Sequence, residues 1–437
     1  MAGAALLTLV LAVCLSVCVA DDPDFSGIDP LMASYIDLGY FPGAVVLVGD
    51  ATGTLFTKGY GAYTYGVEVP EGPLVEGGPN PPIMEETTMF DMASCTKVLM
   101  TTTAVAQLYQ TGDIELDTPM VDERHLGPGY AGRGGTKVDI TPRNLLLHNS
   151  GLPADPEPNF WEVGYDCMQT RQEQPALTYD CLVSIADTVY NMDIINPVGE
   201  VYLYSDVSMM SLMYLVGKIA KDRAYVTAED LLPQCLSDLG TTSEAVYHCY
   251  YEAYIRTHVV APLGLPDTGF LPDPAKWARC AVAEQDEQYL YRLIQGYVSD
   301  GNTFASGGIN GHAGLFTTAL DISVMLHRFL TATEDDTYLK RSTIDLFSTI
   351  GDASFSSRAL GWDTNTDRDG YHYCGTLSEA TYLHLGYTGT QVCIDPVSGV
   401  YTSLLTNRVY PTDHGTSGGV RIAREAFNTM VHDILGL

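Results

Sequence analysis

The sequence predicts an α/β fold of the α+β kind, in which both chain ends build one antiparallel sheet flanked by helices and a mostly helical part is inserted between them. β-branched segments bounded by turn residues occur near both ends, at 42–60 and 382–407. Between them, apolar residues recur mostly at helical spacing and few alternating strands are visible. We therefore expect one domain over 21–437, made of an α/β part (21–120 and 300–437) and a mostly helical part (121–299).

The N-terminal elements follow from local patterns. A short apolar helix is expected near 29–38, and the turn-bounded segments 42–50 and 53–60 predict a hairpin of two strands. From Ser94 onward, apolar residues recur at helical spacing until Gly112. Ser94 is therefore expected at the start of a helix.

The later elements are predicted in the same way. Thr141 followed by Pro142 predicts a helix start, with threonine as the cap and proline in the first turn. Toward the end of the chain, short β-branched runs predict three strands, and an amphipathic pattern predicts a closing helix. These segments are 382–387, 391–395 and 400–407 for the strands and 423–435 for the helix.

The first twenty residues, "MAGAALLTLVLAVCLSVCVA", form one uncharged apolar run that ends in small residues. This pattern predicts a secretory signal peptide over 1–20, cleaved after Ala20. The alternative is an uncleaved membrane anchor, because the run is nearly long enough to span a bilayer. The lack of flanking Lys or Arg favours cleavage, so we expect a secreted, extracellular protein with no stable membrane association.

Ten cysteines are present, and Cys14 and Cys18 would leave with the signal. An even number then remains, which in an exported chain suggests disulfides. Proximity in sequence favours some pairs, although the connectivity stays open and Cys95 and Cys280 would be left over, either paired or free. The favoured pairs are Cys167 with Cys181, Cys235 with Cys249, and Cys374 with Cys393.

The formal net charge is −32. Such a surface repels nucleic acids and anionic membranes, so neither is expected as a partner. The histidines show no compact ligand spacing and the cysteines no Cys-x-x-Cys pair, so no metal and no cofactor are expected. The sequence does not predict the oligomeric state.

The stretch "MFDMASCTKVLM" at 89–100 places a serine, a cysteine and a lysine close together. A serine hydroxyl needs a base within reach, and residues three apart share a helix face, so Lys97 can approach Ser94. A buried lysine can lose its proton, and free N–H groups in a first helical turn can stabilise an oxyanion. Cys95 points away from the Lys97 face and is expected to pack or to form a disulfide.

A second serine motif, 415–419, matches the Gly-x-Ser-x-Gly nucleophile elbow. That motif needs an acid and then a histidine on later elements, whereas only one helix, with His432, is expected to follow. We therefore expect Ser417 to lie in the loop that approaches the closing helix.

Several blocks together resemble the β-lactamase-related serine hydrolases, the group that holds class C β-lactamases, D-alanyl-D-alanine peptidases and their esterase relatives. The block 90–98 resembles the nucleophile helix of this family, and 199–206 resembles its tyrosine motif. Further blocks follow the family order at 140–153, 262–270, 307–318, 384–390 and 405–408, so the resemblance spans roughly 25–435. It implies a β-lactamase/transpeptidase-like fold.

The resemblance also implies roles for particular residues. Ser94 would be the nucleophile, Lys97 its hydrogen-bonded base partner, and Tyr204 the group that relays protons to the leaving group. Asp206 is the third residue of a Tyr-x-Asn-type motif, a variant of the esterase-like relatives. His384 and Gly386 would occupy the place of the family's Lys-Thr-Gly motif, on the strand that lines the cleft. The backbone N–H groups of Ser94 and Tyr387 would form the oxyanion hole.

Two departures from the family pattern bear on the substrate. His384 replaces lysine and carries at most a partial charge near neutral pH, so it would hold a substrate carboxylate less firmly. Leu385 replaces threonine and removes a hydroxyl from the cleft wall. Both changes favour neutral esters or amides over penicillins. His148 and His312 lie in family blocks and are expected to brace loops.

These expectations together describe a secreted serine hydrolase that uses a Ser-x-x-Lys nucleophile and an acyl-enzyme intermediate on small-molecule or peptide substrates. Esters, small amides or D-amino-acid peptides would be cleaved. One alternative is β-lactamase or penicillin-binding protein activity, and another is a catalytically silent binding or scaffold protein on the same fold. The presence of Ser94, Lys97 and Tyr204 together favours the enzyme.

Overall fold

The computed structural model describes residues 23–69, 73–74, 78–162, 165, 167, 181–240, 243–366, 370–413 and 417–437. The predicted signal at 1–20 lies outside these residues. Within the described part of the chain, no helix combines the length and the apolar character needed to cross a membrane.

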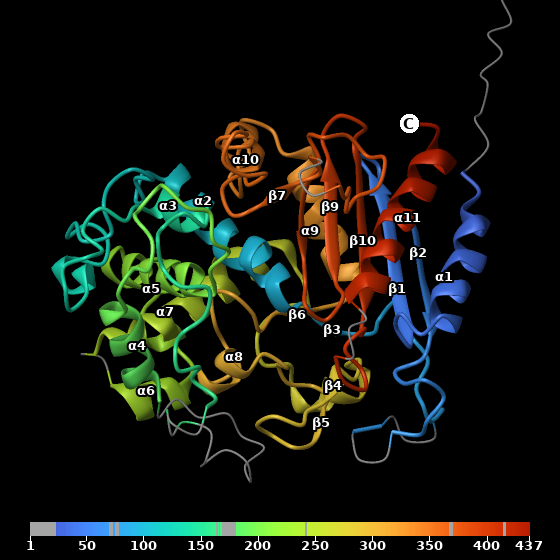
Figure 1. The fold of residues 1–437 in the computed structure, drawn as a ribbon, viewed down its shortest axis with the longest axis horizontal. Helices are drawn as coiled ribbons and strands as arrows, with labels where there is room; N and C mark the ends of the chain where they lie inside the picture. Colours follow the sequence, from blue (N-terminus) through green and yellow to red (C-terminus); the bar gives the residue numbers. More distant parts are fainter. Residues whose placement is uncertain are drawn as a thin grey trace, which may run out of the picture.

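One antiparallel sheet is built from both ends of the chain, as predicted (Figure 1). Its strand order is β2-β1-β10-β9-β8-β7, and β1 from the N-terminal hairpin pairs with β10 in a register that places Val46 opposite Leu404. The strands are β1 (Gly43–Asp50), β2 (Gly53–Gly61), β7 (Asp363–Thr364), β8 (Tyr382–Leu385), β9 (Gln391–Asp395) and β10 (Val400–Thr406). Two short ladders lie outside this sheet: β3 (Phe90–Asp91) with β6 (Phe316–Thr317), and β4 (Glu284–Gln285) with β5 (Leu293–Ile294).

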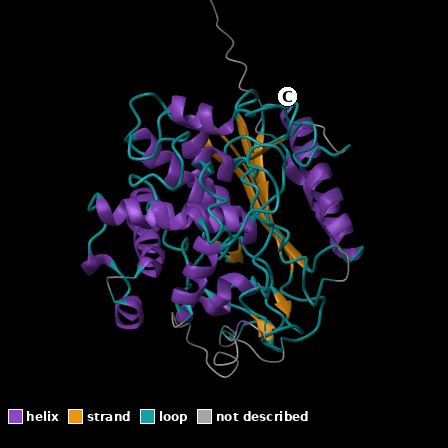
Figure 2. Cartoon of the chain, turned by 60° about the vertical axis from the view of Figure 1, so that its left-hand side comes forward, coloured by secondary structure: helices purple, strands orange, loops and turns teal. Residues whose placement is uncertain are grey.

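Helices cover both faces of the sheet (Figure 2). The terminal helices α1 (Ile28–Asp37) and α11 (Ser417–Leu435) pack on one face, and α9 (Ala319–Thr331) packs on the other. The sequence of β1 explains this arrangement, since alternate residues of a strand point to opposite faces. Val46 and Val48 pack with the terminal helices, whereas Val45 and Leu47 join the larger core.

The remaining described helices mostly gather beside the sheet layer, on the left of Figure 1. In this group α5 packs closely against α7, and their buried residues belong to the same large core as one face of the sheet. The helices are α2 (Thr103–Gln110), α3 (Pro142–Leu146), α4 (Leu182–Asn191), α5 (Asp206–Asp222), α6 (Pro233–Leu239), α7 (Tyr247–Tyr254), α8 (Gly301–Ala305) and α10 (Arg341–Ser348).

Two local predictions need correction. The closing helix begins at Ser417, so this residue lies in α11 and not in a loop before it. The helix expected from Ser94 is irregular at its start, with a 3₁₀ turn over Ala93–Cys95 and a π-helical turn over Lys97–Thr102 before α2. Such π turns inside helices are frequent at functional sites.

The cysteines pair as proximity suggested. Disulfides join Cys167 to Cys181, Cys235 to Cys249 and Cys374 to Cys393. Cys95 and Cys280 are both buried free thiols. The three disulfides are typical of an oxidising environment.

Candidate active site

A strained turn between β3 and the following helix positions Ser94. Ala93, directly before it, has a φ of 44°, a left-handed conformation that is uncommon for a residue other than glycine. The carboxylate of Asp91 holds this turn, because it accepts the N–H of Ala93 at 2.9 Å and that of Ser299 at 2.8 Å. Burial raises the pKa of Asp91 to about 6 despite these bonds.

Lys97 lies one turn below Ser94, and its side chain is fully buried. Its ammonium donates to Ser94 Oγ at 2.8 Å and to the carbonyl oxygen of His312 at 3.0 Å. It also lies 2.8 Å from Asp206 Oδ1, at the first residue of α5. The structure therefore brings Ser94, Lys97 and Asp206 together around the buried ammonium.

A buried lysine can lose its proton, but Lys97 has a carboxylate beside it. Burial does lower the pKa of Lys97, but the charge and hydrogen bond of Asp206, together with Tyr204, outweigh it and hold the pKa above its ordinary value. A carboxylate at ion-pair distance in a buried site stabilises the ammonium strongly. Lys97 is thus protonated at neutral pH.

A second ion pair lies next to the first. His312 Nε2 is 2.9 Å from Asp300 Oδ1 and 4.0 Å from Asp206 Oδ2. Burial lowers the pKa of His312, but Asp300 and Asp206 raise it above its ordinary value. Burial likewise raises the pKa of Asp300, and His312 and Thr303 bring it well below its ordinary value. His312 therefore lies at ion-pair distance from Asp300 beside the nucleophile, and its expected role in bracing the loop stays a prediction.

Three of these groups could together hold a cation, because ligand atoms of Asp206, Asp300 and His312 lie within 4.8 Å of one another. Lys97 Nζ already lies 2.8 Å from Asp206, and His312 Nε2 lies 2.9 Å from Asp300, so both carboxylates have a basic partner within the protein.

Tyr204 lies just before α5 and faces the same group. Its hydroxyl is a hydrogen-bond partner of Lys97. Its ring lies 4.6 Å from the ring of His148, 6.2 Å from that of His384 and 5.1 Å from the Arg358 guanidinium. Burial raises the pKa of Tyr204 and the nearby Lys97 lowers it, with a net rise.

Both histidines beside Tyr204 are neutral. Burial, followed by the positive charges of Arg358 and Lys97, puts the pKa of His384 and that of His148 well below the ordinary value. His384 Nδ1 donates to the carbonyl oxygen of Leu385 at 3.0 Å, and His148 Nδ1 accepts the N–H of Ser205 at 3.1 Å. His384 thus provides no positive charge for a substrate carboxylate.

The end of β8 approaches the nucleophile turn closely at Gly386. A Cβ at this position would lie 2.0 Å from Thr390 Oγ1 and 2.6 Å from the carbonyl oxygen of Met92, so only glycine fits. Tyr387 follows, with 50% of its surface exposed, and the Arg408 guanidinium lies 4.7 Å from its ring. Tyr387 and Ser94 line the same cavity.

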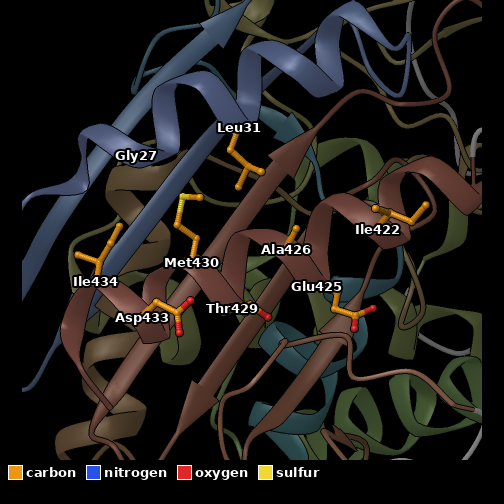
Figure 3. Close-up of a pocket in the computed structure, with 9 residues that line it drawn as sticks. All are labelled: Gly27, Leu31, Ile422, Glu425, Ala426, Thr429, Met430, Asp433 and Ile434. Atoms are coloured by element: carbon orange, nitrogen blue, oxygen red, sulfur yellow. The ribbon is translucent and has the colours of Figure 1, made fainter.

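A cavity of about 210 Å³ contains the side chain of Ser94. Its lining residues are Ala93, Ser94, Trp161, Glu284, Asp286, Gln288, Tyr289, Ser299, Asp300, Gly301, Ala313 and Tyr387. A larger groove of about 750 Å³ runs between α1 and α11, and Figure 3 shows the residues that line it, among them Leu31 and Met430. None of the predicted site residues lies in that groove.

Cys95 is buried and does not line the cavity. Its thiol contacts the carbonyl oxygen of His384 at 3.6 Å and Thr390 Oγ1 at 3.8 Å. Burial raises the pKa of the thiol to about 12, so it is protonated and unreactive near neutral pH. Cys95 therefore packs the nucleophile turn against β8, which is one of the two predicted outcomes.

Asp91, Asp300 and Glu284 belong to the site but did not stand out in the sequence. Asp91 lies within the quoted nucleophile stretch and could have been noticed there, three residues before Ser94. Asp300 and Glu284 carry no motif spacing, and only the fold brings them to the cavity.

The β-lactamase family model matches residues 28–427, so this chain belongs to the β-lactamase family and is a serine hydrolase of that family. The predicted β-lactamase/transpeptidase-like fold is thereby confirmed.

Individual relatives agree with this assignment. The chain is 26% identical over 406 residues to an Escherichia coli (strain K12) protein named "Putative D-alanyl-D-alanine carboxypeptidase", covering 87% of this chain and 81% of that protein. It is 29% identical over 381 residues to an N-acetylmuramyl-L-alanine amidase of Bacillus subtilis (strain 168), covering 84% and 77%. The structure of EstCE1, a hydrolase with promiscuous acyltransferase activity, shares the fold, with a TM-score of 0.61, 18% identity and coverage of 91% and 97%.

Proposed function

We propose that Ser94 is the nucleophile of this serine hydrolase and that it forms an acyl-enzyme on esters, small amides or D-amino-acid peptides. The observation that carries the proposal is the 2.8 Å contact between the Lys97 ammonium and Ser94 Oγ, with Asp206 2.8 Å from the same nitrogen. Nucleophile, base and orienting group lie at the distances that covalent catalysis requires.

The proton route follows from the protonated state of Lys97. In a minor form of the ion pair the proton of Lys97 lies on Asp206, and the neutral amine of that form accepts the proton of Ser94 as Oγ attacks the carbonyl carbon. The carbonyl oxygen is stabilised by the N–H groups of Ser94 and Tyr387. Tyr204, a hydrogen-bond partner of Lys97, carries a proton to the leaving group. Water then cleaves the acyl–Ser94 ester and restores the hydroxyl.

Reaction with a fluorophosphonate probe tests this proposal. Wild type should be labelled, whereas Ser94→Ala should not be and should lose p-nitrophenyl ester turnover by at least about 10³-fold. Cys95→Ala is the matched control, because Cys95 does not line the cavity, and it should keep most of the labelling and turnover. Equal labelling of Ser94→Ala and wild type would exclude Ser94 as the nucleophile, and the scaffold alternative would then stand.

The β-lactamase or penicillin-binding alternative has less support. His384 is neutral, and among the described residues that line the cavity there is no Lys or Arg to hold the carboxylate of a penicillin. The relatives named after carboxypeptidase and amidase activities favour amide substrates.

We also propose that the chain is exported. The three disulfides favour an oxidising compartment, and the apolar run over 1–20 is the expected signal. N-terminal sequencing of the mature protein should read from Asp21. A mature chain that retains Met1 inside the cell would exclude cleavage and export.

A further inference from the structure

The cavity beside Ser94 is negatively charged. Three carboxylates line it, those of Glu284, Asp286 and Asp300, and none of its described lining residues is Lys or Arg. In a partly enclosed site, such a set repels an anionic group and attracts a cationic one.

Two of the three carboxylates already have partners. Asp286 accepts the backbone N–H groups of the loop 288–291. Asp300 is paired with His312 at 2.9 Å. The carboxylate of Glu284, by contrast, makes no hydrogen bond or ion pair with any described residue. Glu284 is therefore the carboxylate of this cavity that is available to a ligand.

The surrounding walls are suited to a small organic cation. Trp161, Tyr289 and Tyr387 line the same cavity, and aromatic faces attract ammonium groups. The positive charge of Arg408 acts on Glu284, but Arg408 is ion-paired with Asp413 at 3.2 Å and does not line the cavity. A positive charge for Glu284 would thus come from the substrate.

We propose, on the basis of the proposed acylation of Ser94, that Glu284 makes the enzyme prefer esters and amides whose acyl part carries a protonated amine. The acyl part stays bonded to Ser94 through acylation and deacylation, so an amine on it can stay beside Glu284 in both steps. Ser94 Oγ forms the new ester bond as the leaving group departs, and water later releases the amino acid. The amine keeps its proton throughout.

Three p-nitrophenyl esters of similar length test the preference: the hexanoate, the 6-aminohexanoate and the monoester of adipic acid. At pH 8, kcat/KM of the wild type should be about tenfold higher for the amine than for the neutral ester, and lower for the carboxylate. In Glu284→Gln the amine-to-neutral ratio should fall to about one. Glu287→Gln, which removes the same charge from an exposed neighbour outside the cavity, should keep the wild-type ratio.

The pH dependence of this ratio separates a charge effect from a change of shape. Burial, followed by Asp286, Asp91 and Asp413, raises the pKa of Glu284 to about 7, and Arg408 lowers it slightly. The tyrosines of the cavity keep their protons in this range. The wild-type ratio should therefore rise severalfold from pH 6 to pH 8, whereas in Glu284→Gln it should stay flat.

The two proposals fail in different ways. If the wild type does not hydrolyse the neutral hexanoate, the proposed function of Ser94 is wrong. If it hydrolyses the hexanoate but shows no amine preference at pH 8, or if Glu284→Gln keeps the preference, the role of Glu284 alone is overturned.

Discussion

Two lysines of this protein are fully buried, and they lie in different electrostatic settings. Lys97 contacts the nucleophile and lies 2.8 Å from the carboxylate of Asp206. Lys137 lies beside the helical group, where its ammonium donates to the carbonyl oxygen of Val189 at 2.9 Å and stands 3.7 Å from the ring of Tyr130. Lys97 thus has a carboxylate as its ion-pair partner, whereas the groups that contact the Lys137 ammonium are a neutral carbonyl oxygen and a neutral aromatic ring.

This difference sets the two protonation states. Burial lowers the pKa of Lys137 to about 7, and the charge of Asp193 only partly opposes it. Burial also lowers the pKa of Lys97, but Asp206 reverses the sign. Burial alone therefore does not make a lysine a base, and the carboxylate at 2.8 Å decides. The lysine whose pKa burial lowers to about 7 is Lys137.

Replacing Asp206 by Asn should make Lys97 resemble Lys137, and this is the largest change we expect. Without the carboxylate, burial dominates and the pKa of Lys97 falls below its ordinary value. Only the neutral lysine can then accept the Ser94 proton, so kcat/KM for a neutral p-nitrophenyl ester should rise with pH, about tenfold per unit below the new pKa. In the wild type the Lys97–Asp206 pair binds one proton throughout this range, and moving that proton within the pair does not depend on pH. We therefore expect kcat/KM of the wild type to stay flat between about pH 6 and 9.

The matched control is Asp193→Asn, which removes the carboxylate that faces Lys137. It should leave the pH profile of hydrolysis unchanged. If kcat/KM of Asp206→Asn depended on pH as that of the wild type does, the ion pair would not set the protonation state of Lys97. The proposed proton route would then be wrong.

Much of the fold could be predicted because its strands are long enough to show a pattern. β1, β9 and β10 each occupy a turn-bounded β-branched run, and pairing of the two chain ends follows from their placement. The two-residue strands β3 and β6 could not be found in this way, since a period of two needs several residues to be visible.

The candidate site also has a part that the sequence indicates and a part that only the fold determines. Ser94, Lys97, Tyr204 and His384 lie in motif blocks, so the sequence indicated them and the structure brings them together. The charge on Lys97 could not be predicted, because it depends on the distance to Asp206 across the fold. The pairing of Asp300 with His312 could not be predicted either, because the two residues are twelve positions apart in sequence and only the fold brings them to 2.9 Å.

The two lysines should also differ, by a smaller effect, in how each makes the free energy of unfolding depend on pH. Lys137 has a folded-state pKa of about 7, whereas in the unfolded chain it would titrate near its ordinary value of about 10.4. Between these values the unfolded chain binds a proton that the folded protein lacks. Lys137 therefore makes the free energy of unfolding rise with pH, by up to about 1.4 kcal/mol per unit.

Lys137→Met removes this contribution, and urea denaturation at pH 7.5 and 8.5 measures it. The free energy of unfolding of the variant relative to wild type should fall by about 1 kcal/mol between the two pH values, because only wild type gains stability over that step. Lys97→Met is the contrasting variant. The folded-state pKa of Lys97 is raised, so its stabilising contribution is fully present below the unfolded pKa and is lost only at higher pH. Its difference from wild type should therefore not change over this step, and equal slopes for the two variants would mean that burial acts alike on both lysines.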